Sequence, residues 1–160
     1  MDTKSGAYAH ALRLLSVRAR SAADVRRRLH KKDYPQEQIE AAIARCQELN
    51  YINDPHTAHE RTRALMREGK VGPRVRQQLN KEGFAEIDIE TAIEACMREF
   101  DEREILAHVF ARRFDIRNTD LHDPRQRRRA VGYLQRRGFS LNKILEHIHE
   151  RLRDLHADHE

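Results

Sequence analysis

Apolar residues in this chain recur every three or four positions, which is the spacing of one face of an α-helix. The clearest groups are Val25, Leu29, Ile39, Ile43, Cys46 and Leu49, and then Val75, Leu79, Ile89, Ile93 and Cys96. The sequence contains no run in which apolar and polar residues alternate as they do in a half-buried strand. The pattern therefore predicts an all-α fold.

These apolar groups belong to one longer pattern that occurs three times. The copies read LHKKDYPQEQIEAAIARC from Leu29, LNKEGFAEIDIETAIEAC from Leu79 and LQRRGFSLNKILEHI from Leu134, so they begin 50 and 55 residues apart. In each copy the leucine is followed by an aromatic residue, which is Tyr34, Phe84 or Phe139. The chain is therefore expected to be a tandem repeat.

The residue before each aromatic predicts how a helix ends. Gly83 and Gly138 readily adopt the left-handed conformation that terminates a helix, and Asp33 tolerates it. The aromatic residue that follows can then pack back on the leucine of its own copy. We expect one helix, a hydrophobic contact that closes its end, and a second helix a few residues later.

Three short motifs predict where helices begin. The segment Ser21-Ala22-Ala23-Asp24 resembles a capping box with an acidic residue at the third helical position. Asp54-Pro55 and Asp123-Pro124 each place an N-cap residue before a proline suited to the first helical turn. One further helix precedes each copy of the pattern, over about 7–18, 56–68 and 102–115, and the first of these supplies Leu12, Leu14 and Leu15.

The sequence thus predicts three helices for each copy of the pattern. We expect three tandem three-helix repeats over residues 1–54, 55–101 and 102–160, the last with a short polar C-terminal tail. Repeats this small bury little apolar surface alone and stack on their neighbours. The expected result is an elongated, curved, solenoid-like body.

Composition favours a folded protein with an acidic partner. Charged residues make up 36% of the chain and apolar residues 39%, but the apolar ones are periodic, which argues against disorder. The formal net charge is +5, and most of the 31 basic residues are arginine. Because arginine binds phosphate and carboxylate through two hydrogen bonds, the partner is expected to be nucleic acid or an acidic protein surface.

The sequence also predicts a cytoplasmic protein. Its N-terminus has no basic segment followed by a long apolar one, so no signal peptide is expected. No apolar run approaches the roughly 18 residues that suggest a membrane span, and no membrane partner is expected. Cys46 and Cys96 occupy equivalent positions in two copies, and in a reducing compartment we expect them to be small apolar core residues.

Charge follows the repeat as well, because the second helices are basic and the third helices of the first two repeats are acidic. The candidate contacts to DNA or to another acidic partner are Arg26, Arg27, Arg28, Lys31, Lys32, Arg74, Arg76, Lys81, Arg125, Arg127, Arg128, Arg129, Arg136 and Arg137. The alternative is that these charges form salt bridges between neighbouring helices or simply face water. For RQRRRAVGYLQRR a binding role is favoured, because so much like charge on one helix repels itself unless a partner neutralises it. Gln77 and Gln126 form no repeated set, so contact with phosphates is expected rather than base reading.

The sequence shows no catalytic or cofactor motif. Gly69-Lys70 lacks the upstream glycine of a phosphate-binding loop, and Val71 replaces the required Ser or Thr. The closest histidine pairs, in HTAHE and HIHE, do not form the HExxH pattern, and no cysteine pair lies near them. We therefore expect exposed surface histidines, no metal, no cofactor and no enzymatic activity.

Four segments taken together resemble a known family. They read LLSVRARSAADVRRRL, AIARCQELNYINDPHTA, GPRVRQQLNKEGF and RRRAVGYLQRRGF, and in this order and spacing they are similar to the RecX family of RecA regulators, from about residue 7 to residue 152. The nearest matches to the family's pattern are Arg18, Ser21, Leu29, the stretch 51–54, Gly72-Pro73, Val75, Leu79 and Gly83. Two departures are visible: REGKVGP carries one residue more between its glycines than the usual form, and Asp33 stands where a glycine is common.

The resemblance implies a regulatory protein rather than an enzyme. Members of the RecX family bind in the groove of the RecA–single-stranded-DNA filament, restrain its ATPase, strand-exchange and coprotease activities, and promote its disassembly. By this resemblance we expect the partner to be that filament. From the charge pattern we expect the three basic second helices to form a stripe that contacts DNA weakly and without sequence preference, and we expect a monomer. The residues leave two alternatives open, a stand-alone, sequence-independent DNA-binding module and a helical scaffold for an unrelated acidic protein.

Overall fold

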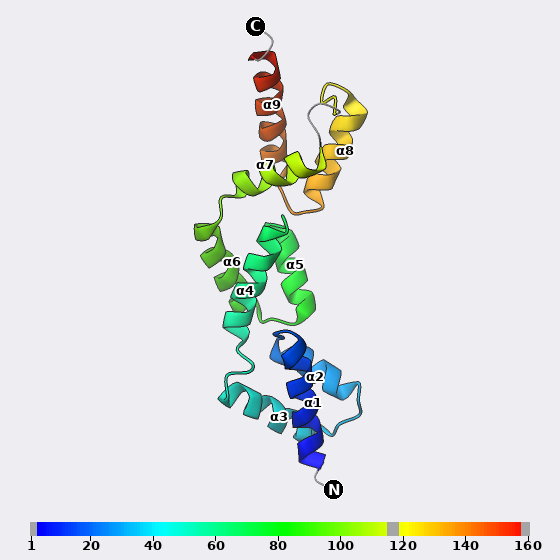
Figure 1. Cartoon of the computed structure of the whole chain (residues 1–160), viewed down its shortest axis with the longest axis vertical. Coiled ribbons are helices and arrows are strands. Elements are labelled where there is room, and N and C mark those ends of the chain that lie inside the picture. Colours follow the sequence, from blue (N-terminus) through cyan, green and yellow to red (C-terminus); the bar gives the residue numbers. More distant parts are fainter. Residues whose placement is uncertain (1–2, 115–118, 158–160) are drawn as a thin grey trace. The chain divides into compact units, whose positions relative to one another are not determined.

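The computed structural model describes residues 3–114 and 119–157, and side chains within 6–114 and 119–154. These residues form nine α-helices and no strand, which confirms the predicted all-α fold (Figure 1). The helices are α1 (Thr3–Val17), α2 (Ala22–His30), α3 (Gln36–Glu48), α4 (Asp54–Arg67), α5 (Gly72–Glu82), α6 (Glu86–Glu99), α7 (Glu102–Arg113), α8 (Pro124–Gln135) and α9 (Leu141–Ala157).

The chain divides into two compact units. The first unit comprises Met1–Thr62 with Arg76–Ala95, and the second comprises Arg63–Val75 with Cys96–Glu160. The limits of the units fall within α4, α5 and α6 rather than between repeats. The repeat boundaries at 54/55 and 101/102 therefore stay a prediction, because the units follow spatial contacts and the repeats follow sequence similarity.

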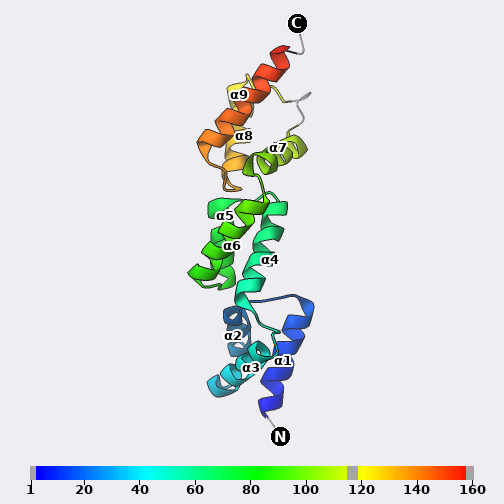
Figure 2. The same ribbon diagram turned by 90° about the vertical axis from the view of Figure 1, so that its left-hand side faces the viewer.

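In the first unit, α1 packs chiefly against α3 and also contacts α2 (Figures 1 and 2). The face of α1 that is fully buried carries alanines rather than leucines: Ala7 and Ala11 are buried, whereas Leu12 and Leu15 are only partly buried at the edge of the core. Small side chains let the helix backbones approach closely. The core of this unit is Ala7, Ala11, Ala22, Val25, Leu29, Ile39, Ala42, Ile43, Cys46 and Ile52.

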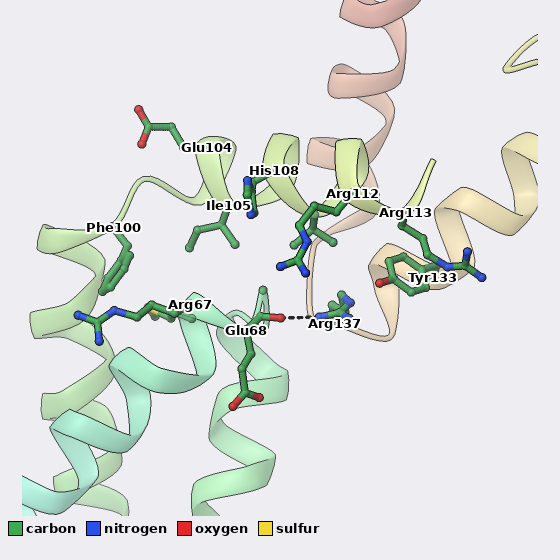
Figure 3. A pocket seen from close by; sticks show the side chains of 13 residues that line it. Arg67, Glu68, Phe100, Glu104, Ile105, His108, Arg112, Arg113, Tyr133 and Arg137 are labelled. Atoms are coloured by element: carbon green, nitrogen blue, oxygen red, sulfur yellow. Dashed lines mark hydrogen bonds between the residues drawn. The ribbon is translucent and has the colours of Figure 1, made fainter. Parts of the chain in front are cut away.

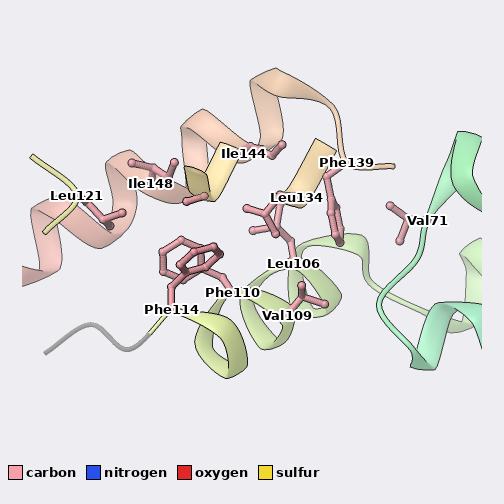
Figure 4. Close-up of a cluster of buried hydrophobic side chains, with 11 residues drawn as sticks. Val71, Leu106, Val109, Phe110, Phe114, Leu121, Leu134, Phe139, Ile144 and Ile148 are labelled. Atoms are coloured by element: carbon pink, nitrogen blue, oxygen red, sulfur yellow. The ribbon is translucent and has the colours of Figure 1, made fainter. Parts of the chain in front are cut away.

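In the second unit, α8 and α9 lie side by side, and α7 packs against both (Figure 2). Their apolar faces meet in one core around Phe110, which is fully buried and stacks at a tilt on Phe114 (Figure 4). The core is Val71, Leu106, Val109, Phe110, Phe114, Leu121, Ala130, Leu134, Phe139, Ile144 and Ile148. Both units thus bury the leucine and isoleucine positions that recur in the sequence.

The second helix of each repeat ends as predicted. Asp33, Gly83 and Gly138 have positive φ angles of 57°, 86° and 103°. The backbone N–H of the next residue donates to the carbonyl of the recurring leucine, from Tyr34 to Leu29 at 3.5 Å, from Phe84 to Leu79 at 3.2 Å and from Phe139 to Leu134 at 3.3 Å. This is the hydrogen bond of a Schellman ending, and it brings each aromatic residue back onto its helix.

Two of the three predicted helix starts are confirmed, and the third is corrected. The Ser21 hydroxyl accepts from the N–H of Asp24 at 3.0 Å, and Asp123 caps α8 ahead of Pro124. The residue that caps α4 is Asn53 and not Asp54, because the Asn53 side chain accepts from the N–H of His56 at 3.1 Å. The Asp54 carboxylate instead accepts from the N–H of Ala22 at 2.9 Å, at the start of α2.

The turn that follows the second helix of one repeat packs on the start of the second helix of the repeat before it. The turn after α5 thus contacts the start of α2, and the turn after α8 contacts the start of α5. In the first unit, the Ser21 hydroxyl donates to the Glu82 carbonyl at 2.6 Å, and a Cβ at Gly83 would lie 2.9 Å from that of Ala23. In the second unit, the Val71 N–H donates to the Arg137 carbonyl at 2.9 Å, and a Cβ at Gly138 would lie 2.1 Å from the Val71 carbonyl oxygen. Equivalent positions of the repeat thus make equivalent contacts.

The two cysteines of the chain lie in the core, and no described helix is suited to span a membrane. Cys46 and Cys96 are both fully buried, which confirms their prediction as core residues, and burial raises the pKa of the Cys46 thiol. Within residues 3–114 and 119–157, no helix has the length and apolar character needed to cross a bilayer.

The close contact at Gly138 predicts that a side chain there destabilises the fold, and Gly132 in the same repeat provides a control. Gly138→Ala is expected to lower the free energy of unfolding by about 1–3 kcal/mol, because the residue has a positive φ and the added Cβ meets backbone. Gly132→Ala, within α8, is expected to raise it by about 0.5–1 kcal/mol, because only the flexible end of Arg136 lies near the new Cβ. Urea unfolding followed by circular dichroism measures both, and equal effects would contradict the assigned contact.

Candidate nucleic-acid interface

The arginines of α2 are held by a buried carboxylate. The side chain of Asp24 is 6% exposed and forms ion pairs with Arg20, Arg27 and Arg28, at 2.8 Å from Arg20 and 2.9 Å from Arg28. Burial alone would raise the pKa of Asp24, but hydrogen bonds from Arg28 and Arg20 and the charges of Arg28 and Arg27 outweigh it, so the pKa lies below its ordinary value. These arginines neutralise an internal charge.

A second type of ion pair links the basic second helix to the acidic third helix in two repeats. Arg26 of α2 donates two hydrogen bonds to Glu40 of α3, at 2.7 and 2.9 Å, and these hydrogen bonds lower the pKa of the Glu40 carboxyl. At the equivalent positions, Arg76 of α5 pairs with Glu90 of α6, and also with Glu86. For these residues the structure agrees with the salt-bridge alternative that the sequence left open.

The third repeat lacks this pair. The positions equivalent to Arg26 and Glu40 hold Val131 in α8 and Leu145 in α9, both partly buried. Two apolar side chains thus replace the ion pair in this repeat. This is so even though α8 carries more arginines than α2 or α5. The positive charge of α8 therefore lies elsewhere on the helix.

Five exposed arginines, which we term the α8 arginine cluster, lie on α8 and at its C-cap. They are Arg125, Arg127, Arg128, Arg129 and Arg136. Among the residues that the structure describes, no carboxylate lies within ion-pairing distance of any of them, and the one hydrogen bond of their side chains within that set runs from Arg128 to the Pro124 carbonyl of its own helix. Because like charges this close repel each other, the cluster is suited to bind an anion such as a phosphodiester backbone.

The remaining predicted residues divide into two kinds. Lys31, Lys32, Arg74 and Lys81 have exposed side chains on α2 and α5 or at their ends. Arg137 differs, because its guanidinium donates to the Glu68 carbonyl at 2.6 Å and lies 4.9 Å from the centre of the Tyr133 ring. The continuous stripe expected from the sequence stays a prediction, since α2 and α8 belong to different units.

The expectation of exposed surface histidines is wrong for His147, and His10 and His59 are also only partly exposed. The His147 ring packs edge-on against Phe110, with the ring centres 5.1 Å apart, and burial lowers the pKa of the imidazole. His30, His56, His108, His122 and His149 are exposed, as expected. Throughout 6–114 and 119–154, no three His, Cys, Asp or Glu side chains are grouped so that they could hold a metal ion.

Sequence reasoning missed a cavity of about 630 Å³ in the second unit (Figure 3). It is lined by the end of α4, by α7 and by α8, and it includes Arg67, Arg112, Arg113 and Tyr133, none of which belongs to the predicted contact residues. The one signal in the sequence is the spacing of Tyr133 and Arg137, four residues apart, which places both on one helix face.

Comparison with known proteins identifies the family. The family model described as "RecX, first three-helix domain" matches residues 7–46. The regulatory protein RecX of Syntrophotalea carbinolica is 37% identical over 94% of this chain and 99% of its own length, and that of Trichlorobacter lovleyi is 32% identical over 88% and 92%. A solved structure, "Crystal structure of regulatory protein RecX", superimposes with a TM-score of 0.72 at 26% identity, over 93% of this chain and 74% of that one. The fold is thus that of a helical-repeat regulatory protein, and the chain belongs to the RecX family.

The buried ion pairs of Asp24 predict a pH-dependent loss of stability. Asp24→Asn is expected to lower the free energy of unfolding at neutral pH by roughly 3 kcal/mol, because it leaves Arg20 buried without a carboxylate partner. Since the folded-state pKa of Asp24 is lowered, its contribution is complete above the ordinary value of about 3.9 and disappears as the pH falls through the lowered pKa. The difference between the wild type and Asp24→Asn should therefore shrink in acid.

Urea unfolding at a series of pH values measures this difference. Glu48→Gln is the matched control, because it removes an exposed ion pair with Arg45 and should change stability by less than about 0.5 kcal/mol. A loss in Asp24→Asn as small as in the control would show that the α2 arginines do not depend on this carboxylate.

Proposed function

We propose that this protein binds the RecA–single-stranded-DNA filament and inhibits the recombinase, ATPase and coprotease activities of RecA. It acts in the cytoplasm as a binding protein, without a cofactor and without catalysing a reaction. Membership of the RecX family supports the choice of partner, because relatives that match this chain along most of their length are named regulatory proteins.

The observation that carries the proposal is the contrast between paired and unpaired arginines. Arg26 and Arg76 are each neutralised by a glutamate of the following helix, whereas the α8 arginine cluster has no carboxylate partner within the described residues. A phosphodiester backbone supplies regularly spaced negative charge, and its binding releases condensed counterions. The cluster therefore gains most from nucleic acid, and its contacts to phosphates carry no sequence preference.

A RecA filament presents both DNA and protein surface to a protein that binds it. The acidic third helix of the first repeat, α3, exposes Glu37 and can contact basic protein surface while α8 contacts DNA. A protein held by both kinds of contact acts at concentrations well below those at which it binds bare DNA. This difference separates a filament regulator from a stand-alone DNA-binding module.

The proposal predicts that α8 is needed for inhibition. Substoichiometric amounts of the protein are expected to lower the DNA-dependent ATPase rate of RecA filaments. Replacing Arg127, Arg128 and Arg129 with glutamate should raise the concentration needed for half-inhibition about tenfold or more, because three phosphate contacts become repulsive. The ATPase rate, measured against protein concentration with RecA and DNA held constant, tests both statements.

A control triple variant, Arg13→Glu, Arg45→Glu and Arg153→Glu, makes the same change in net charge on exposed positions of α1, α3 and α9 and should inhibit like the wild type. An ATPase rate that the wild type leaves unchanged would overturn the proposed function. Inhibition only at concentrations that saturate bare DNA would favour the stand-alone DNA-binding module. Equal inhibition by both triple variants would exclude the α8 arginine cluster as the contact.

A further inference from the structure

One cavity of the second unit, between the end of α4, α7 and α8, has the size of a small-ligand site. Its volume of about 630 Å³ lies within the range of pockets that enclose a small organic molecule. All of its lining residues belong to the second unit, and they come from the end of α4 and the turn after it, from Phe100 and α7, and from α8 and the turn after it (Figure 3). The question is which chemistry these walls would recognise.

Three of the positive or titratable groups that line the cavity face it, whereas the guanidinium groups of Arg67 and Arg113 and the two carboxylates point away from it (Figure 3). The guanidinium of Arg112 reaches toward its centre, Arg137 lies on its floor, and the ring of His108 faces it (Figure 3). The carboxylates of Glu104 and Glu68 point outward, and Glu68 pairs with Lys70 at 2.7 Å. Within the part of the chain that the structure describes, Arg112 is not within ion-pairing distance of a carboxylate. The cavity therefore favours a ligand that carries negative charge.

Tyr133 provides a fixed polar atom on the same side. Arg137 lies 4.9 Å and Arg113 5.8 Å from the centre of its ring, and Phe114 packs against it edge-on at 5.5 Å. These contacts hold the ring in place, and its hydroxyl is directed toward the cavity (Figure 3). In the described set the hydroxyl has no hydrogen-bond partner, so it is available to a ligand.

The opposite wall is apolar. Phe100 and Ile105 present their side chains to the cavity from the segment before α7 and from its first turn (Figure 3). Aromatic and aliphatic surfaces of this kind accept the face of a planar base, whatever its identity. A ligand that suits both walls combines a planar, weakly polar ring with an anionic group.

The cationic side of the cavity is preorganised by backbone contacts. The Arg137 guanidinium donates to the Glu68 carbonyl at 2.6 Å, and the Arg137 carbonyl accepts from Val71 at 2.9 Å. Gly69 is closely covered, because a Cβ there would lie 2.3 Å from a methyl group of Val109. Donors that are fixed before binding lose little freedom when a ligand enters.

We propose that this cavity binds one unstacked nucleotide of single-stranded nucleic acid. Its base lies between Phe100 and the hydroxyl of Tyr133, and its phosphate contacts Arg112 and Arg137. The α8 arginine cluster, which adjoins Arg137 through Arg136, neutralises the neighbouring phosphates of the same strand. A nucleotide is favoured over an acidic peptide because the cavity combines the aromatic ring of Phe100 with arginines, which stack on bases as well as binding phosphates.

The test compares two single-stranded oligonucleotides that have the same phosphates, one with all of its bases and one abasic along its central part. By fluorescence anisotropy, the wild type is expected to bind the complete oligonucleotide about tenfold more tightly. Tyr133→Phe, which keeps the ring and its packing, and Arg112→Gln should each reduce this preference severalfold. Arg103→Gln, also on α7 but paired with Glu150 outside the cavity, should leave the preference unchanged.

Equal affinity of the wild type for both oligonucleotides would overturn the proposal, because it would show that no base is held. A preference that Tyr133→Phe and Arg112→Gln leave intact would place the base elsewhere and would also overturn it. An acidic peptide that displaces the complete oligonucleotide but not the abasic one would assign the cavity to a protein ligand instead. The measurement contains no RecA, so its result and that of the filament ATPase assay can fail independently.

Discussion

The repeats depend on one contact, in which the glycine that ends a second helix packs on the start of an earlier helix. This glycine has the left-handed backbone conformation. Gly83 packs against Ala23 in the first unit, and Gly138 packs against Val71 in the second. Each contact satisfies two requirements at once, because it ends one helix and gives a hydrogen-bond partner to a group at the start of another, the hydroxyl of Ser21 or the N–H of Val71. A Cβ would crowd the Ala23 methyl group at Gly83 and the Val71 backbone at Gly138, so both contacts require glycine at this spacing between helices.

This packing leaves the charged residues free to vary between repeats. In the first two repeats the same register brings Arg26 to Glu40 and Arg76 to Glu90. In the third repeat the corresponding positions are Val131 and Leu145, and the arginines of α8 lie on exposed positions without a partner in the described residues. One scaffold therefore carries arginines with two different roles, stabilising pairs in α2 and α5 and an anion-binding cluster in α8.

Local features could be predicted from the sequence, and long-range ones could not. The endings at Gly83 and Gly138 were predictable because they depend on residues within one turn. The cap of α4 was misassigned to Asp54, because Asn53 is an equally good cap and the use of the Asp54 carboxylate at Ala22 depends on chain folding. The composition of a basic helix does not reveal whether its arginines are paired.

The cavity illustrates the same limit. Its walls come from three segments that are distant in the sequence, and its cationic floor forms only because Arg137 reaches the Glu68 carbonyl. Likewise, the leucines of α1 were the visible apolar residues, whereas the helix buries Ala7 and Ala11 most completely. Small residues and long-range contacts give almost no periodic signal, although they determine how closely helices approach.

The salt dependence of binding to single-stranded DNA tests most directly the claim that unpaired arginines bind phosphates and paired ones do not. Replacing Arg128 and Arg129 with glutamine should reduce the magnitude of the slope of log K against log salt by about 1.4, because each phosphate that is no longer neutralised accounts for about 0.7. Replacing Arg26 and Arg76 with glutamine should leave the slope unchanged. Equal changes of slope in the two double variants would contradict the division of the arginines into a structural and a binding set.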